Sequence, residues 1–310
     1  MDRREFLKRV AAWSAGMTVV GPLFRVTQTA FAAAPPTSGI GSVPTLALAS
    51  GADYEKLVTK VLGALGGMKK FVKAGAKVVV KPNIGWDRNP AQGANTHPQV
   101  VKALVKQALD AGASKVMVFD RTCNDSRRCY ANSGIAEAVE SIGDRRAACE
   151  FIDNRKFVPV KIEKGVLVAE WEFYKDALDV DCYINVPVAK HHGTSRLTLG
   201  MKNVMGVIGG NRGTIHQSIG QRLADLNTVI RPKLTVIDAT RIMFRNGPAG
   251  GNLSDVKILD TIIASTDPVA SDAYATTLFN LKPDDISSTR AAYQAGLGEM
   301  DLSKIRALRV

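Results

Sequence analysis

Charged and hydrogen-bonding side chains follow five of the strands predicted from this sequence, at the point where each strand ends. The clusters are Lys-Pro-Asn at 81–83, Asp-Arg-Thr at 120–122, Lys-His-His at 190–192, Asp-Ala-Thr at 238–240 and Ser-Thr-Asp at 265–267. Lysine can hold an anion, imidazole can transfer a proton near neutral pH, and a carboxylate can orient an imidazole or bind a metal. Asp and Thr are also ordinary caps and turn residues, which explains Asp267 well, whereas Lys and His are not favoured caps. The lysines and histidines therefore indicate a functional site.

We expect one group of these residues to act on protons and a second group to hold a ligand. The catalytic candidates are Lys190, His191, His192, Asp120 and Asp238. The ligand-binding candidates are Lys81, Asn83, Lys202, Asn203, Arg212, Gly209 and Gly210. In this hypothesis the lysines bind a carboxylate or phosphate, the asparagines are neutral donors, and a histidine transfers the proton.

A glycine-rich segment at 200–213 contains five glycines together with Lys202 and Arg212, and it precedes a predicted helix. Glycine lets backbone N–H groups approach an anion closely, and a helix N-terminus adds a favourable potential. The segment lacks the Gly-Lys-Ser/Thr of a Walker A loop and the G-x-G-x-x-G of a dinucleotide-binding turn. It is either an anion-binding loop or a structural turn, and the lysines of the neighbouring loops favour the first interpretation.

The histidines leave a metal site open as an alternative. His191 or His192 could bind a divalent metal together with Asp120 or Asp238, but no His-x-x-x-His or His-Glu-x-x-His pair is present. Adjacent residues of a strand point to opposite sides, so at most one of the two histidines could join such a site. The same imidazole could equally serve as a general base or a hydrogen-bond donor.

The four cysteines, at 123, 129, 149 and 182, have a spacing that matches no iron–sulfur run. In an oxidising compartment, a disulfide between Cys123 and Cys129 would close the turn at 124–128. Free thiols are the second alternative, and a metal or cluster is the third. The cofactor is therefore unknown at this point, with a divalent metal favoured over an iron–sulfur cluster.

Strand and helix patterns alternate along the chain after residue 44. Apolar or β-branched runs predict strands at 45–49, 77–80, 116–119, 157–162, 166–173, 183–188, 234–237 and 261–264, and apolar residues at helical spacing predict helices near 57–65, 97–111, 174–178, 215–230 and 268–278. This alternation predicts one α/β domain over 45–310, with a mostly parallel sheet and helices on both faces. Because the carboxyl ends of parallel strands lie at one edge, the polar clusters should converge on a crevice there.

The N-terminal residues 1–32 have the order of a secretory signal. Twin arginines at 3 and 4 precede Phe-Leu-Lys within the first ten residues, an apolar stretch follows, and an Ala-Phe-Ala cleavage site lies at 30–32. The twin arginines resemble a twin-arginine translocation signal, although Asp2 replaces the usual Ser or Thr. We therefore expect export by the twin-arginine machinery to the periplasm, a flexible lead-in at 33–44, and no stable membrane span after cleavage.

The charge balance narrows the choice of partner. The 310 residues include 41 Lys+Arg and 29 Asp+Glu, for a net charge of +12, and removal of a signal with five basic and two acidic residues leaves +9. The basic residues are scattered pairs without a recognition module, and aromatic residues make up 6%, so nucleic-acid binding is not expected. The excess positive charge indicates instead a small anionic ligand.

Six motifs together resemble the bacterial family called domain of unknown function 362. They are Lys-Pro-Asn-Ile-Gly-Trp at 81–86, Cys-Asn-Asp-Ser-Arg-Arg-Cys-Tyr at 123–130, Asn-Val-Pro-Val-Ala-Lys-His-His at 185–192, Leu-Gly-Met-Lys-Asn at 199–203, Asn-Gly-Pro at 246–248 and Asp-Pro-Val-Ala-Ser-Asp-Ala-Tyr at 267–274. The resemblance implies little about activity, because the family is named for its lack of a known function. Some members carry a ferredoxin-like iron–sulfur segment, but this chain has no Cys-x-x-Cys-x-x-Cys run.

Three functions fit these residues. The first is an enzyme that acts on a small carboxylate or phosphate, with or without a metal. The second is a non-catalytic periplasmic protein that binds a small ligand in the same pocket. The third is an iron–sulfur electron-transfer protein. We favour the enzyme, because the loops combine His, Lys and Asp where a binding protein would need fewer titratable groups.

Overall fold

The β-branched and apolar runs form a ten-stranded sheet in the computed structural model, which describes residues 43–310. The order along the sheet is β12-β1-β11-β10-β7-β2-β3-β4, with β8 paired to β10 and β9. The strands are β1 (Thr45–Ser50), β2 (Lys77–Pro82), β3 (Lys115–Val118), β4 (Ala147–Cys149), β7 (Cys182–Val186), β8 (Val188–His192), β9 (Arg196–Thr198), β10 (Leu234–Met243), β11 (Val256–Ser265) and β12 (Arg306–Arg309). A separate antiparallel pair comprises β5 (Phe157–Lys161) and β6 (Glu170–Tyr174).

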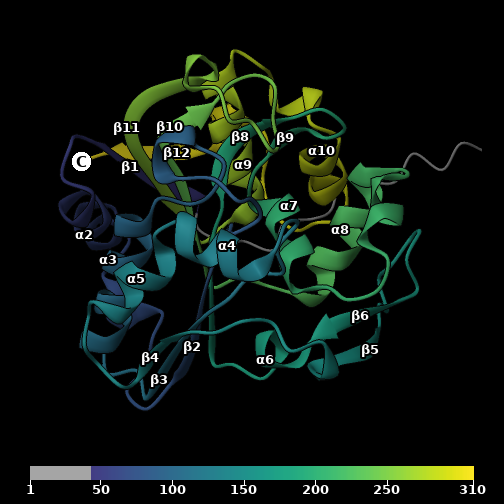
Figure 1. The fold of residues 1–310 in the computed structure, drawn as a ribbon. Coiled ribbons are helices and arrows are strands. Elements are labelled where there is room, and N and C mark those ends of the chain that lie inside the picture. Colours follow the sequence, from purple (N-terminus) through teal and green to yellow (C-terminus); the bar gives the residue numbers. More distant parts are fainter. Residues whose placement is uncertain (1–42) are drawn as a thin grey trace, which may run out of the picture. The chain divides into compact units, whose positions relative to one another are not determined.

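Helices cover both faces of the sheet (Figure 1). They are α2 (Tyr54–Ala64), α3 (Pro98–Asp110), α4 (Ser126–Asn132), α5 (Ile135–Glu140), α6 (Lys175–Leu178), α7 (Gly200–Asn203), α8 (Ile219–Val229), α9 (Pro268–Thr276) and α10 (Ser287–Gln294). Alternate residues of β2 show the two faces: Val78 and Val80 pack in the core under α2 and α3, and Val79 packs in the core under α8. Such continuously buried strands are expected of a sheet covered on both sides. The predicted α/β class is confirmed.

The strand directions explain which polar clusters can meet. The strands β10, β7, β2, β3 and β4 are parallel to their neighbours in this order, so their carboxyl ends share one edge. The strand β11 runs antiparallel to both β10 and β1. The expectation that residues 265–267 reach the common crevice was therefore wrong, because they leave β11 at the opposite edge. There Asp267 caps α9 and accepts from the backbone N–H groups of Val269 and Ala270.

Two further predicted strand ends lie inside longer strands. The strand β10 continues through Asp238 to Met243, so the side chain of Asp238 does not end in a loop. After β7 ends at Val186, Pro187 intervenes and the chain resumes as β8, which contains Lys190, His191 and His192. Because side chains alternate along a strand, Lys190 and His192 lie on one side of β8 and His191 lies on the other.

The predicted helix at 215–230 is also divided. Residues 212–216 form a 3₁₀ turn, and α8 begins only at Ile219. The helices α4, α5 and α10 were not predicted. Among residues 43–310, no helix combines the length and apolar character needed to cross a membrane. The signal at 1–32 and nearly all of the lead-in at 33–44 lie outside the described residues.

A buried ion pair joins the carboxyl ends of β2 and β3. The Nζ atom of Lys81 lies 2.8 Å from Oδ1 of Asp120, and the two side chains are 0% and 2% exposed. Lys81 Nζ also donates to Oδ1 of Asn203 at 2.9 Å, and Asp120 Oδ2 accepts from the backbone N–H of Ile84 at 2.6 Å. Gly206 lies against the pair, since a Cβ there would overlap Asp120 Oδ1 and Lys81 Nζ. The glycine-rich segment can therefore close over the sheet only with a glycine at this position.

Loss of one partner of this pair should be costly, because it leaves the other charge buried without compensation. We expect Lys81→Met to lower the free energy of unfolding by about 3–5 kcal/mol. In the double variant Lys81→Met/Asp120→Asn the loss should be smaller, since neither charge remains. Urea unfolding of the three proteins measures both effects, and a single variant as stable as the parent would contradict the assigned pairing.

Candidate functional site

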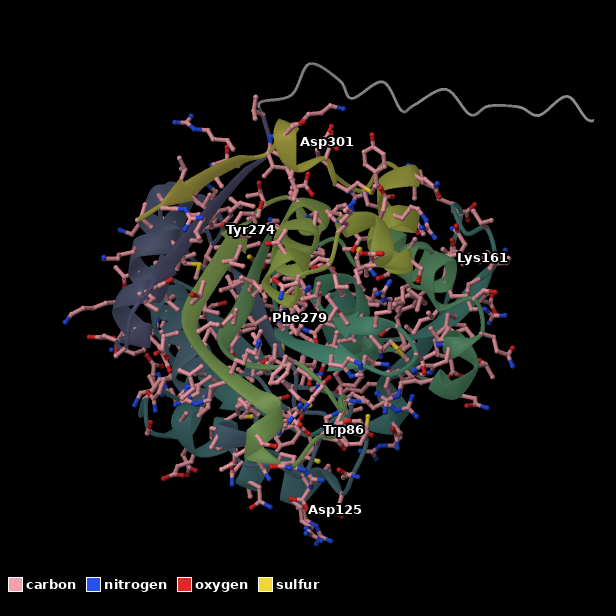
Figure 2. All side chains as sticks on the ribbon, turned by 90° about the horizontal axis from the view of Figure 1, so that it is seen from above. Trp86, Asp125, Lys161, Tyr274, Phe279 and Asp301 are labelled. Carbon is pink, nitrogen blue, oxygen red and sulfur yellow. The ribbon has the colours of Figure 1, made fainter. Side chains whose placement is uncertain are left out.

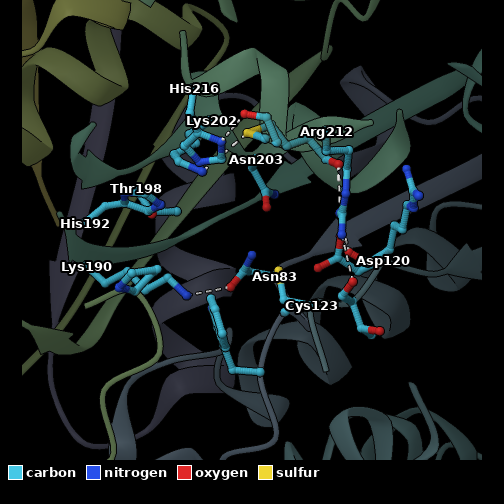
Figure 3. A pocket seen from close by; sticks show the side chains of 18 of the residues that line it. Asn83, Asp120, Cys123, Lys190, His192, Thr198, Lys202, Asn203, Arg212 and His216 are labelled. Atoms are coloured by element: carbon cyan, nitrogen blue, oxygen red, sulfur yellow. Dashed lines mark hydrogen bonds between the residues drawn. The ribbon is translucent and has the colours of Figure 1, made fainter. Parts of the chain in front are cut away.

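A cavity of about 590 Å³ opens at the carboxyl ends of β2 and β3, beside β8 and the glycine-rich segment. Its lining residues are Asn83, Gly85, Trp86, Asp120, Arg121, Thr122, Cys123, Lys190, His192, Thr198, Lys202, Asn203, Met205, Gly206, Gly210, Asn211, Arg212, Gly213, His216 and Pro248. Side chains from all of these segments point into one space (Figure 3). The position agrees with the rule that ligands of open parallel sheets bind outside the carboxyl ends of the strands.

Eight of the twelve predicted site residues line this cavity. They are Asn83, Asp120, Lys190, His192, Lys202, Asn203, Gly210 and Arg212. Lys81 lies directly beneath them and is occupied by its contacts with Asp120 and Asn203. Its positive charge therefore holds the site together, and the predicted direct contact of Lys81 with a ligand is not supported by this geometry.

Three predicted residues lie elsewhere. His191 points to the other side of β8, where its Nδ1 accepts from the backbone N–H of Gly247 at 3.1 Å. Asp238 accepts from the backbone N–H of His97 at 2.6 Å and from the N–H and hydroxyl of Thr240. Gly209 packs against Glu172 and donates its N–H to the Glu172 carbonyl. None of the three lines the cavity, and Asp238 in addition uses both of its carboxylate oxygens in contacts with the protein.

Lys190 is the most deeply buried cation of the cavity, with 1% of its surface exposed. Its Nζ donates to Oδ1 of Asn83 at 2.9 Å and to the carbonyl of Ala94. Burial, together with the positive charge of Lys202, lowers the pKa of Lys190 to about 7. A buried ammonium that contacts only neutral acceptors is readily deprotonated. Its charged form is strongly stabilised when an anion binds next to it.

The other cations of the cavity also lack an acidic partner. Burial lowers the pKa of Lys202 to about 8, and its Nζ lies 3.3 Å from Sδ of Met205. The guanidinium of Arg212 donates to backbone carbonyls, including that of Thr122 at 2.8 Å, and Arg121 likewise donates to carbonyls. Within residues 43–310 no carboxylate forms an ion pair with any of these four cations.

The balance of charge in the cavity is therefore strongly positive. Asp120 is the one acidic side chain among the lining residues of the described chain, and Lys81 already neutralises it. Lys190, Lys202, Arg121 and Arg212 have no counterion among residues 43–310. Such a concave cluster focuses a positive potential on its centre and favours an anionic ligand.

Two stacked histidines form one wall of the cavity. The rings of His192 and His216 have centroids 5.6 Å apart and planes inclined by 20°. Nδ1 of His192 accepts from the backbone N–H groups of Thr194 and Ser195, which places its proton on Nε2. Nδ1 of His216 faces the carbonyl of Gly213 at 3.2 Å and must be the donor there, which leaves Nε2 as an acceptor. One ring thus offers a donor and the other a base.

Burial and the surrounding positive charges keep this pair neutral. Burial and the positive charge of Lys202 lower the pKa of His192 to about 3. Burial, again with Lys202, lowers the pKa of His216. His192 is consequently a neutral hydrogen-bond donor at physiological pH, a role that imidazole can play beside a developing negative charge.

Several residues of the site were missed by sequence reasoning. Arg121 lay inside a motif already singled out after β3, and His216 begins a predicted helix, so both carried a weak signal. Thr198 carried none, because it reaches the cavity through the antiparallel pairing of β8 with β9, where it lies opposite Lys190. Trp86 and Pro248 belong to motifs that resembled the family but had no role assigned.

The predicted disulfide is not formed. Cys123 is exposed and lines the cavity, whereas Cys129 is buried in the core, with its Sγ 3.8 Å from the carbonyl of Gly85. The turn between them thus directs the two thiols into different surroundings. In the described part of the chain, no group of three or more His, Cys, Asp or Glu side chains could hold a metal ion. Of the residues of the mixed His/Asp hypothesis, His191 and Asp238 lie outside the cavity, Asp120 is paired with Lys81, and Nδ1 of His192 accepts from the backbone.

Solved structures of distant proteins share part of this architecture. A Thermotoga maritima protein is 12% identical, with a TM-score of 0.48, and the match covers 74% of this chain and 60% of that protein. The lactate racemase apoprotein of Thermoanaerobacterium thermosaccharolyticum is also 12% identical, with a TM-score of 0.47, and the match covers 74% and 56% of the two chains. This chain thus spans less than two thirds of either protein, and the likeness concerns the fold alone.

Sequence comparison gives a nearer relative and a family. A thylakoid-associated protein of Synechocystis is 27% identical over 249 residues, which are 76% of this chain and 73% of that protein. The family described as domain of unknown function (DUF362) matches residues 78–277, which include β3, β8, the glycine-rich segment and all of β2 except its first residue. The protein therefore belongs to the DUF362 family.

Proposed function

We propose that this protein is an enzyme that binds a small carboxylate or phosphate in the cavity and moves a proton on the bound molecule. The observation that carries the proposal is the group of four lining cations without an acidic partner in the described residues. A cavity of about 590 Å³ accommodates a molecule of metabolite size. Arg212 and Lys202 would bind the acid group, and Lys190 would lie beneath it.

The two histidines favour an enzyme over a binding protein. A protein that only retains an anion gains nothing from a neutral imidazole donor next to an imidazole base. Here His216 offers an unprotonated Nε2 and His192 a protonated one. In the proposed reaction His216 accepts a proton from the bound molecule, while the Nε2–H of His192 stabilises the negative charge that develops.

Neither a metal nor an iron–sulfur cluster is assigned a step. The described residues bring no three His, Cys, Asp or Glu side chains together, and the cysteines lie in separate surroundings. The proposed proton transfer uses the side chains of this chain alone.

Removal of one unpaired cation should weaken anion binding without unfolding the protein. We expect Lys202→Met to lower the affinity for inorganic phosphate or a small carboxylate by about 10- to 150-fold, the equivalent of one charge-assisted hydrogen bond of about 1.5–3 kcal/mol. Isothermal titration calorimetry measures the change. Lys161→Met is the matched control, because Lys161 is exposed at the rim of the molecule, apart from the cavity residue Trp86 (Figure 2). Equal losses in both variants would refute a local role for Lys202.

Binding should also depend on pH with a defined sign. Lys190 and Lys202 have pKa values of about 7 and about 8 in the free protein, and a bound anion raises both by favouring the ammonium forms. Binding near pH 8 therefore takes up protons, and affinity falls as the pH rises from 7 to 9, by at most about tenfold per unit for each proton linked. Titrations in buffers of different ionisation enthalpy count the protons. Proton release on binding would be inconsistent with this assignment.

We also propose that residues 1–32 direct export through the twin-arginine pathway to the periplasm. The support is the sequence pattern, in which twin arginines precede an apolar stretch and an Ala-Phe-Ala site. In a bacterial host, the full chain should acquire a new N-terminus at Ala33, and Arg3→Lys/Arg4→Lys should remain uncleaved in the cytoplasm. Cell fractionation and N-terminal sequencing test this, with Arg9→Lys as the control. Unaltered export of the double variant would exclude the twin-arginine route.

A further inference from the structure

The short helix α7 carries two residues of the cavity, Lys202 and Asn203, and lies against α8, α9 and β7 (Figure 1). It has only 4 residues, and Leu199, which precedes it, offers no side-chain acceptor to the N–H groups of its first turn. A helix of this length is not stable through its own hydrogen bonds, and its first N–H groups need acceptors from elsewhere when they are buried. The position of Lys202 must therefore be fixed by other parts of the chain.

Asp272 on α9 supplies these acceptors. Its Oδ1 accepts from the backbone N–H of Gly200 at 2.7 Å, and its Oδ2 accepts from the backbone N–H of Met201 at 2.9 Å. Asp272 is 1% exposed, and no cation among residues 43–310 compensates its charge. A buried carboxylate is costly unless it is hydrogen-bonded, so the two N–H groups are its stabilising partners. The close approach requires a glycine, because a Cβ at Gly200 would lie 2.7 Å from Oδ1.

Two buried asparagines hold the carbonyl groups of the same two residues. Asn185 of β7 donates its Nδ2 to the carbonyl of Gly200 at 3.1 Å, and Asn227 of α8 donates its Nδ2 to the carbonyl of Met201 at 2.8 Å. The N–H and the carbonyl of both residues are thus bound by side chains from three different elements. Lys202 is the next residue along the chain, so its backbone is held in one place relative to the cavity.

We propose that Asp272 is a positioning residue of the anion site, which holds α7 so that Lys202 faces the bound anion. This inference rests on the proposed anion site. Asp272 does not line the cavity and therefore acts through the residues of α7. Asn203 attaches α7 to Lys81 on the sheet, and Asp272 attaches it to α9. The motif at 267–274, which had no assigned role in the site, contributes to it in this way.

Removal of the carboxylate tests this role. The side chain of Asp272→Asn can accept from only one of the two N–H groups, so the affinity of the full chain for inorganic phosphate should fall about tenfold, and by no more than in Lys202→Met. Asp225→Asn is the matched control, because Asp225 is also 1% exposed and accepts from two consecutive backbone N–H groups, those of Leu167 and Val168, outside the cavity. The control should lose comparable stability in urea and keep the parent affinity in calorimetry.

Two further measurements distinguish positioning from a general loss of stability. Because Asp272 acts through Lys202, Asp272→Asn should cause no further loss of affinity in the Lys202→Met background, whereas a general defect lowers the affinity by the same factor in both backgrounds. Burial is the main cause of the lowered pKa of Lys202. A lysine released from its buried position is already protonated near pH 8, so proton uptake on binding should decrease in Asp272→Asn and not in Asp225→Asn.

Three results would overturn the positioning role and leave the anion site intact. They are an affinity of Asp272→Asn within about twofold of the parent, an equal loss in Asp225→Asn, and a loss that adds to that of Lys202→Met. If Asp272→Asn does not fold, Asn227→Ala, which frees the carbonyl of Met201 instead, replaces it with the same expected outcomes. Absence of phosphate binding by the parent chain would overturn both proposals.

Discussion

The buried pair of Lys81 and Asp120 is the interaction on which the site depends. It joins the ends of two neighbouring parallel strands and, through Asn203, attaches α7 to them. Asn203 in turn donates to the Lys81 carbonyl and to Asn185 on β7, so three adjacent strands and one helix share a single polar network. Such a network is stable only when every member is satisfied, which explains why Gly206 must leave room for both charges. The same pair neutralises Asp120, and the cavity above it is positive for that reason.

The topology of the sheet determines which side chains lie in the positive potential of the cavity. Because β2 and β3 are parallel neighbours, the loops after them meet and bring Asn83 close to Cys123. The strand β8 adds Lys190 and His192 from one of its sides and sends His191 to the other. A shift of one residue along β8 would exchange these roles. The site therefore depends on the register of β8 as much as on the identity of its residues.

The sequence predicted the class of the fold because the class follows from periodicity, and eight of the twelve predicted site residues line the candidate cavity for the same reason. Apolar runs of four to six residues alternate with helical patterns, and the lysines 81, 190 and 202 all proved to lie at the shared strand edge. What could not be predicted depends on contacts distant in sequence. The antiparallel direction of β11 and the continuation of β10 past Asp238 are decided by strand pairing. Three further features depend on contacts with backbone groups that no local sequence pattern reveals. The first is that Lys190 and His191 point to opposite sides of β8. The others are the tautomers of the two stacked histidine rings and the different surroundings of Cys123 and Cys129.

The unpaired cations connect stability with ligand binding. A buried ammonium without a carboxylate is costly for the folded chain, and the lowered pKa values of Lys190 and Lys202 express that cost. A carboxylate from the protein would remove the cost but would also occupy the place of a ligand. With Asp120 paired with Lys81, the described part of the chain retains four cations without an acidic partner, and an anion from solution can supply one. An anion that enters the cavity relieves the desolvation of the lysines and stabilises the folded state at the same time, since it binds the native chain and not the unfolded one. The positive charge of the cavity thus favours the binding of an anionic ligand. The excess of basic over acidic residues in the sequence is consistent with this preference.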